Sequence, residues 1–190
     1  MSVRKQYTES RIEGGVKMKP WERYEKPILF STEMVKAILK NIKRATRRPI
    51  KYSFLPGYNP KWTGYKAVFE YGKFFFVGSN GEPATKPVKA PAKVGDILYV
   101  RETWCYHKTG GWYGYKADGD YRDLDLKWHP SIHMPKEAAR IWLKVTNVRV
   151  ERLQDITSKD IEDEGTYLEN LNTGEEYRFV WVIEFERIEK

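Results

Sequence analysis

Stretches of alternating apolar and polar residues, separated by glycine and proline turns, constrain the fold of this chain more than any other feature. The clearest alternation lies at 139–153 and in the second half of 179–188, and a Gly-Asp turn feeds a further strand at 94–104. A period of two predicts β-strands, and the length of the stretch at 139–153 predicts a bent or bulged strand. Strands outnumber the segments with helical spacing, and most neighbouring strands can pair antiparallel. We therefore expect an α+β chain built on a small twisted β-barrel, with helices packed across its openings.

The first half contains a short strand at 26–30 and then a helix. Ser31 or Thr32 can cap this helix, and Pro49 ends it at or before Arg48. The apolar stripe of the helix consists of Met34, Val35, Ile38, Leu39 and Ile42. The cations expected on its polar side are Lys36, Lys40, Lys43 and Arg47. A hairpin is predicted at 67–77, and a short acidic helix at 156–165.

A chain of 190 residues fits one domain. Residues 1–25 have no sustained periodicity, so we expect a flexible N-terminal arm there. The expected domain occupies 26–190, with turn-rich and aromatic-rich insertions at about 52–93 and 106–135. These insertions are predicted to decorate one barrel rather than to form further domains.

The composition indicates the cellular compartment in which the chain is expected. Cys105 is the only cysteine, so no intrachain disulfide can form, and we predict that its thiol is buried and inert. The sequence has no apolar run long enough to span a bilayer, and its N-terminus lacks the apolar region of a secretory signal. A cytoplasmic protein without a membrane partner is therefore expected.

Charge is unevenly distributed along the chain, whose net charge is +8. Residues 34–51 carry seven bases and no acid, whereas acids outnumber bases by 12 to 5 from Glu151 onward. A strongly basic segment favours an anionic partner such as a nucleotide or nucleic acid, although many basic surfaces bind nothing specific.

The sequence does not predict a metal or a cofactor. His129 and His133 are four residues apart, but the intervening Pro130 excludes a helix that would carry both as ligands. No glycine-rich phosphate loop is present. We expect residues 128–135 to form an ordered loop in which Trp128 and Met134 pack and one histidine contacts backbone or ligand.

Aromatic residues interleaved with lysine and arginine could stack on bases. Packing of the core and the hairpins is nevertheless expected to account for well over half of them. The residues in question are Trp62, Tyr65, Phe69, Tyr99, Trp104, Tyr106, Trp112, Tyr113 and Tyr115.

Lys43 and Thr46 are three residues apart, the spacing of neighbours on a helical turn. A partly desolvated lysine among other cations becomes a better base at neutral pH, and a hydroxyl beside such an amine can act as a nucleophile. The alternative from the residues alone is a solvated lysine and a threonine that only caps or pairs.

Several segments together resemble the ASCH superfamily. They are "KPILFSTEMVKAILKNIKRATRRPIK", "GDILYVRETW", "WHPSIHMP" with "AARIWLKVTNVRVERLQDIT", and "VWVIEFERI". The resemblance implies a PUA-like β-barrel. The usual family motif at the first helix end resembles Gly-x-Lys-Thr-x-Thr-Arg; here Asn41 replaces the glycine and Arg44 the first threonine, while Lys43, Thr46 and Arg48 match.

Small members of this superfamily hydrolyse N4-acetylcytidine, and the resemblance implies the same chemistry here. It assigns catalysis to Lys43, Thr46 and Glu164, with Glu162 and Asp163 as alternatives to Glu164. The expected substrate is an N4-acylated cytosine nucleoside or base, and no cofactor is implied. The residues expected to bind it are Arg48, Arg101, Glu102, Trp104, Tyr99 and His133.

Two routes remain open for this chemistry. Thr46 attacks the amide with Lys43 as base, or Lys43 and Glu164 activate a water directly. Three other functions also remain open: an RNA-binding PUA-like module without amidase activity, a ribonuclease, and a phage assembly protein. A clamp on phosphates has no need for Thr46 or Glu164, which favours the amidohydrolase.

Overall fold

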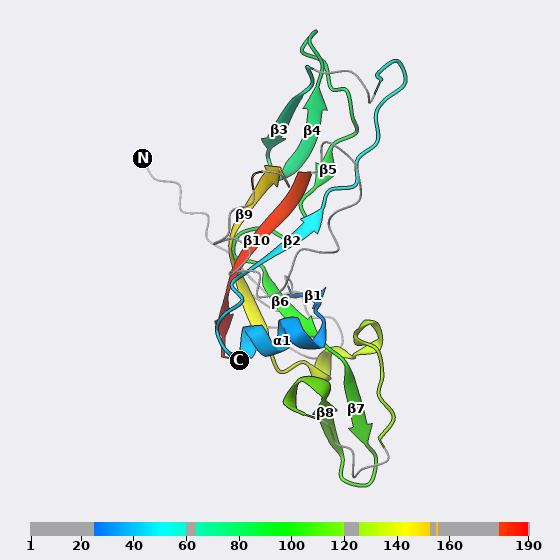
Figure 1. Cartoon of the computed structure of the whole chain (residues 1–190), viewed down its shortest axis with the longest axis vertical. Coiled ribbons are helices and arrows are strands. Elements are labelled where there is room, and N and C mark those ends of the chain that lie inside the picture. The colour runs from blue at the N-terminus through cyan, green and yellow to red at the C-terminus, as the bar shows by residue number, and fades with distance from the viewer. Residues whose placement is uncertain (1–24, 60–63, 120–125, 153–154, 156–178, 190) are drawn as a thin grey trace, which may run out of the picture.

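A five-stranded sheet with one helix packed against it forms the centre of the molecule (Figure 1). The computed structural model describes residues 25–59, 64–119, 126–152, 155 and 179–189. The strand order is β1-β6-β9-β10-β2, and every neighbouring pair is antiparallel except β1 and β6, which are parallel. The bounds of these strands are β1 Glu25–Leu29, β2 Ala45–Pro49, β6 Ile97–Arg101, β9 Trp142–Arg152 and β10 Phe179–Ile188.

Strands dominate the described residues, and α1 (Thr32–Leu39) is the one α-helix among them. The prediction of a mostly β chain is therefore confirmed. β1 and β2 end the strand order, so the described strands form an open sheet and no closed barrel is found among them. The helix predicted at 156–165 lies outside the described residues. No helix in the described part of the chain has the length and apolar character that crossing a membrane requires.

The longest pairing in the sheet joins β9 to β10 and contains a bulge. Asn147 opposes Glu184 and Val145 opposes Phe185, so Thr146 is the extra residue on β9. A bulge bends its strand and increases the local twist. The bent or bulged strand predicted at 139–153 is thereby confirmed over Trp142–Arg152.

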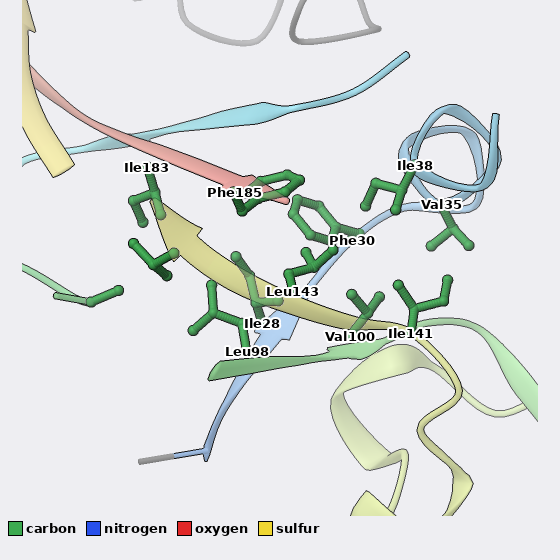
Figure 2. Close-up of a cluster of buried hydrophobic side chains, with 12 residues drawn as sticks. Ile28, Phe30, Val35, Ile38, Leu98, Val100, Ile141, Leu143, Ile183 and Phe185 are labelled. Carbon is green, nitrogen blue, oxygen red and sulfur yellow. The ribbon is translucent and has the colours of Figure 1, made fainter. Parts of the chain in front are cut away.

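The main core lies between α1 and the sheet (Figure 2). Val35 and Ile38 of α1 point toward strand residues, as the predicted apolar stripe requires. Ser31 caps the helix, because its side chain accepts a hydrogen bond from the Met34 N–H at 3.3 Å. The buried members of this core are Ile28, Phe30, Val35, Ile38, Ala92, Leu98, Val100, Ile141, Leu143, Val145, Ile183 and Phe185.

The first insertion forms a second sheet, which packs against the start of β10 in the central sheet (Figure 1). Phe74 lies 5.0 Å from Phe179 and 6.4 Å from Trp181, ring centre to ring centre. The hairpin predicted at 67–77 is confirmed. The strands of the second sheet are β3 Lys66–Glu70, β4 Lys73–Val77 and β5 Val88–Lys89.

The turn of this hairpin has an unusual residue in it. Glu70 pairs with Lys73, leaving Tyr71 at φ 49° and Gly72 at φ 71° as the two central residues. Two-residue hairpin turns with both φ values positive favour Asn-Gly, whereas a tyrosine is strained in this region. The Tyr71 side chain is 97% exposed and so has little packing to lose.

Replacing Tyr71 by asparagine is therefore expected to raise the free energy of unfolding by about 0.5–1 kcal/mol. Urea denaturation would show this as a higher midpoint with an unchanged slope. The matched control is Tyr106→Asn, an exposed tyrosine inside a strand, where the same change should destabilise. A lower midpoint for Tyr71→Asn would contradict the prediction.

The second insertion contributes a hairpin that extends beyond the end of β6 (Figure 1). Cys105 is fully buried and faces Gly114, where a Cβ atom would lie 2.7 Å from the sulfur. The prediction of a buried thiol is therefore confirmed, and this burial raises the pKa of the Cys105 thiol. The remaining elements are β7 Trp104–His107, β8 Trp112–Tyr115, η2 Lys116–Asp118, η3 Ser131–His133 and η4 Lys136–Ala138.

Candidate functional site

Lys43 and Thr46 do not lie on a helical turn, so that part of the prediction is wrong. α1 ends at Leu39, Lys43 lies in the connection that follows, and Thr46 is the second residue of β2. Pro49 is likewise the last residue of β2 rather than the end of a helix. Lys43 and Arg47, which were expected on the polar side of the helix, therefore lie beyond its end.

Asn41 is the physical reason for the early end of the helix. It has φ 58°, its N–H donates to the Ile38 carbonyl at 3.0 Å, and the next N–H, of Ile42, donates to Ala37 at 2.9 Å. This pair of bonds is a Schellman cap, whose left-handed residue is usually glycine and sometimes asparagine. The resembled motif has glycine at this position, and Asn41 adopts the conformation that glycine favours there.

Lys43 and Thr46 are both almost completely buried, with 2% of each residue exposed. Thr46 pairs with Ile183 across β2 and β10, and directly paired residues point to the same face of a sheet. Ile183 belongs to the core that also contains Phe30. The Lys43 Nζ atom lies over the Phe30 ring, 5.7 Å from its centre. The amine and the hydroxyl therefore both border the core beneath α1.

Arg48 shares this neighbourhood. It is two residues beyond Thr46 in β2 and therefore points to the same face. Its guanidinium carbon lies 5.5 Å from the centre of the Phe30 ring, and its Nη2 donates to the Leu29 carbonyl at 2.7 Å. The structure thus places the Lys43 amine and the Arg48 guanidinium over the Phe30 ring, and Thr46 on the same face of β2 as Arg48.

Arg47 points the other way, because successive residues of a strand alternate between faces. Its side chain is 1% exposed and pairs with Glu151 at 3.1 Å. Glu151 also accepts from Arg149 at 2.7 Å, and Arg149 contacts Glu184. Burial lowers the pKa of Arg149, but the hydrogen bonds to Glu151 and Glu184 outweigh it and raise that pKa. The basic segment therefore divides between two faces, and not all of its cations surround Lys43.

Arg101 lies at the end of β6, beside the same region. The Phe30 N–H donates to the Arg101 carbonyl at 3.2 Å. The Arg101 side chain, however, donates to the Met134 carbonyl at 2.8 Å and also contacts the Ile132 carbonyl. Its guanidinium holds the loop at 128–135, which is ordered and contains the buried Met134 as predicted.

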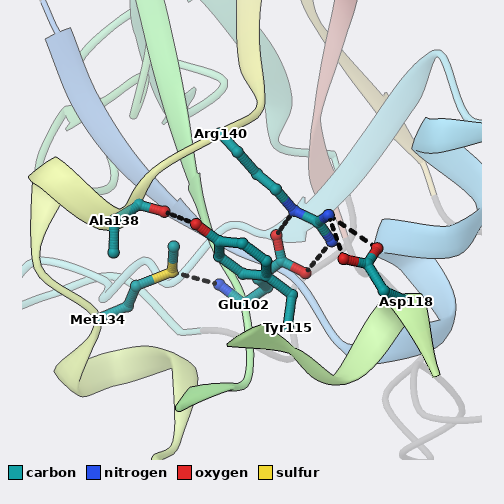
Figure 3. Close-up of polar contacts among 6 residues, drawn as sticks. All are labelled: Glu102, Tyr115, Asp118, Met134, Ala138 and Arg140. Carbon is teal, nitrogen blue, oxygen red and sulfur yellow. Dashed lines mark hydrogen bonds and ion pairs between the residues drawn. The ribbon is translucent and has the colours of Figure 1, made fainter. Parts of the chain in front are cut away.

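Glu102 follows Arg101 and forms the centre of a polar cluster (Figure 3). It is 1% exposed, and Arg140 donates to both of its oxygens, at 2.9 and 3.1 Å. Arg140 also donates to Asp118 at 2.7 Å, and its guanidinium carbon lies 4.0 Å from the centre of the Tyr115 ring. Burial raises the pKa of Glu102, while the hydrogen bond and charge of Arg140 oppose that rise.

Glu102 is predicted from the sequence as a binding residue and Tyr115 as one of the aromatic residues that could stack on bases, but Arg140 and Asp118 were missed. Arg140 stands next to the apolar start of β9, and a lone cation in such a position indicates a buried acid partner. The partner could not be identified in advance, because the contact joins residues 38 positions apart.

The other predicted binding residues lie in two further places. The Tyr99 ring packs 5.9 Å from Trp142, and the Trp104 ring stacks on His129 with centres 4.9 Å apart. His133 is exposed in η3. None of the six predicted binding residues lines the cavity described below.

Glu164 lies outside the described residues, as do Glu162 and Asp163. Among the residues that are described, no group of three or more His, Cys, Asp or Glu side chains gathers in a way that could hold a metal ion.

A cavity of about 590 Å³ lies between the β3–β4 hairpin and β9. Neither Lys43 nor Thr46 contributes to its wall, so the cavity and the candidate catalytic residues are separate features of the molecule. Its lining residues are Tyr65, Lys66, Ala67, Val68, Phe69, Phe74, Val150, Glu151, Arg152, Asp155 and Phe179.

Comparisons with known proteins identify no relative of this chain. No protein-family model matches the chain, and no curated protein or solved structure matches it either.

Proposed function

We propose that this protein is an amidohydrolase that removes the acyl group from N4-acylated cytosine nucleosides or bases. The observation that carries the proposal is the burial of Lys43 and Thr46 against one core, with 2% of each exposed. A lysine removed from water suits proton transfer, and a threonine hydroxyl that borders the same core can serve as the nucleophile.

The same burial argues against a phosphate clamp. Cations that grip a nucleic-acid backbone must reach its phosphates from the surface. Lys43 lies over a buried ring, and the neighbouring Arg47 pairs with Glu151. Two cations of the basic segment are thus withdrawn from the surface that an RNA-binding module would present.

In the proposed reaction, the Thr46 Oγ1 atom bonds to the carbonyl carbon of the acyl amide while its proton passes to the Lys43 Nζ atom. The tetrahedral intermediate then collapses, the bond from carbon to N4 breaks, and a proton returns to N4. Water hydrolyses the acyl-threonine ester and releases the acid. Glu164 would hold Lys43 or relay the proton, and Arg48 or backbone N–H groups would stabilise the oxyanion.

A second route remains within the proposal. Lys43 and Glu164 would activate a water that attacks the amide directly, and Thr46 would then only orient the substrate. The PUA-like barrel that the resemblance implies also belongs to this proposal. It is supported by a twisted sheet in which the chain passes from β1 through α1 into β2 at opposite edges.

Purified protein incubated with N4-acetylcytidine is expected to release cytidine. Ultraviolet absorbance measures the formation of cytidine over time. A series of longer N4-acyl groups would define the acyl preference, and N6-acetyladenosine serves as a matched amide on another base. Absence of turnover with every N4-acylcytosine tested would overturn the proposal. Salt-dependent binding of RNA without turnover would favour the binding module instead.

A further inference from the structure

We infer that Phe30 is a positioning residue that holds the Lys43 amine against the face of its ring and stabilises the ammonium that forms when Lys43 takes the Thr46 proton. The inference rests on the proposed function, because Lys43 acts as a base only in that reaction. The contact itself can be measured independently of any substrate.

The geometry of the contact supports this role. The Lys43 Nζ atom lies 5.7 Å from the ring centre, within the range of about 6 Å over which a cation is attracted to an aromatic face. Both residues are 2% exposed, so water does not screen the attraction. Cation–π contacts are strongest in such desolvated surroundings.

The backbone of Phe30 is fixed on both sides. Its N–H donates to the Arg101 carbonyl at 3.2 Å, and the next residue, Ser31, caps α1. The ring also packs on Phe185, with centres 6.1 Å apart. A ring held by a strand end, a helix cap and a second ring can define the place of a flexible lysine side chain.

Arg48 uses the same ring, with its guanidinium carbon 5.5 Å from the centre. Phe30 therefore links the proposed base to the proposed oxyanion donor. Loss of the ring would remove this contact from both cations, whereas loss of a core side chain that contacts neither cation would not.

A graded test replaces Phe30 by phenylalanines that carry one, two or three ring fluorines. Each fluorine makes the face of the ring less negative and changes the shape of the side chain little. We expect kcat to fall in steps, to a total of about 10-fold to 30-fold, with little change in KM. Phe30→Leu, which removes the ring, should show the largest loss of kcat in this series.

The matched control is the same series at Phe185, which is 5% exposed and against which the described part of the chain records no cation. It should leave kcat within about 2-fold of the parent enzyme. Equal losses at Phe30 and Phe185 would overturn the inference, because both would then reflect packing alone.

Nuclear magnetic resonance provides the readout that needs no activity. A lysine side chain held over a ring face has ε-protons shifted upfield, and Lys43→Met identifies its signal. We expect the shift to disappear in Phe30→Leu and to persist in Phe185→Leu. An unshifted Lys43 in the parent protein would overturn the inference even if the enzyme is active. A shifted Lys43 without turnover would support the contact and overturn the proposed function.

Discussion

Turnover of N4-acetylcytidine is expected to fall by about 10³-fold or more when Lys43 is replaced by methionine. Methionine occupies a similar volume in the buried site but cannot take a proton. Steady-state kcat/KM measures the loss, and circular dichroism checks that the fold is kept. Lys40→Met is the control, because Lys40 is the exposed C-cap of α1 and should leave turnover within about 2-fold of the parent.

The variant Lys43→Arg separates a base from a fixed positive charge. Arginine keeps the cation, yet its guanidinium does not release a proton under ordinary conditions. We expect Lys43→Arg to be as inactive as Lys43→Met. Activity close to that of the parent would contradict the role of Lys43 as a base.

Thr46 variants decide between the two routes. Thr46→Val keeps the shape of the buried side chain and removes the nucleophile, so attack by Thr46 predicts a loss of about 10³-fold that Thr46→Ser largely restores. Direct attack by water predicts a loss of less than about 10-fold for Thr46→Val, because no covalent step then passes through residue 46.

Patterns with a local cause predicted the strands well. The strand predicted at 179–188 coincides with β10, and the turn predicted at Gly72 joins β3 to β4. Both depend on residues that are neighbours in the sequence. The bulge in β9 was also expected, because the stretch at 139–153 is too long for a regular strand.

The candidate site was predicted less completely, because its geometry depends on tertiary contacts. A three-residue spacing places side chains together on a helix, but Asn41 ends the helix before Lys43. Phe30 was not selected at all, since nothing local distinguishes a buried phenylalanine that contacts cations from one that only fills space. The only local signal was the position of Phe30 directly before the helix cap at Ser31.

Arg140→Met is expected to lower the free energy of unfolding by about 3–5 kcal/mol at pH 7. The change leaves the carboxylate of Glu102, which is 1% exposed, without the guanidinium that contacts both of its oxygens. Asp118 is 37% exposed in its side chain and stays hydrated, so it adds little to the loss. Urea denaturation measures the effect, and the exposed Arg187→Met should change the free energy by less than about 0.5 kcal/mol.

The deficit of Arg140→Met should depend on pH in a defined direction. Burial already raises the pKa of Glu102 above its ordinary 4.5 in the parent protein, and loss of Arg140 removes the groups that oppose this rise. A folded state that binds more protons than the unfolded one loses stability as pH rises through the window between 4.5 and the folded pKa. The deficit is therefore expected to be largest near neutral pH and to shrink as the pH is lowered toward 4.5.

The double variant Glu102→Gln with Arg140→Met tests whether the charge of Glu102 causes the loss. Glutamine has nearly the same shape and no charge to leave buried, so we expect the double variant to be more stable than Arg140→Met alone at pH 7. It should also lose the pH dependence of the deficit. Equal stability of the single and double variants at every pH would mean that Arg140 acts through its packing on Tyr115 rather than through the carboxylate.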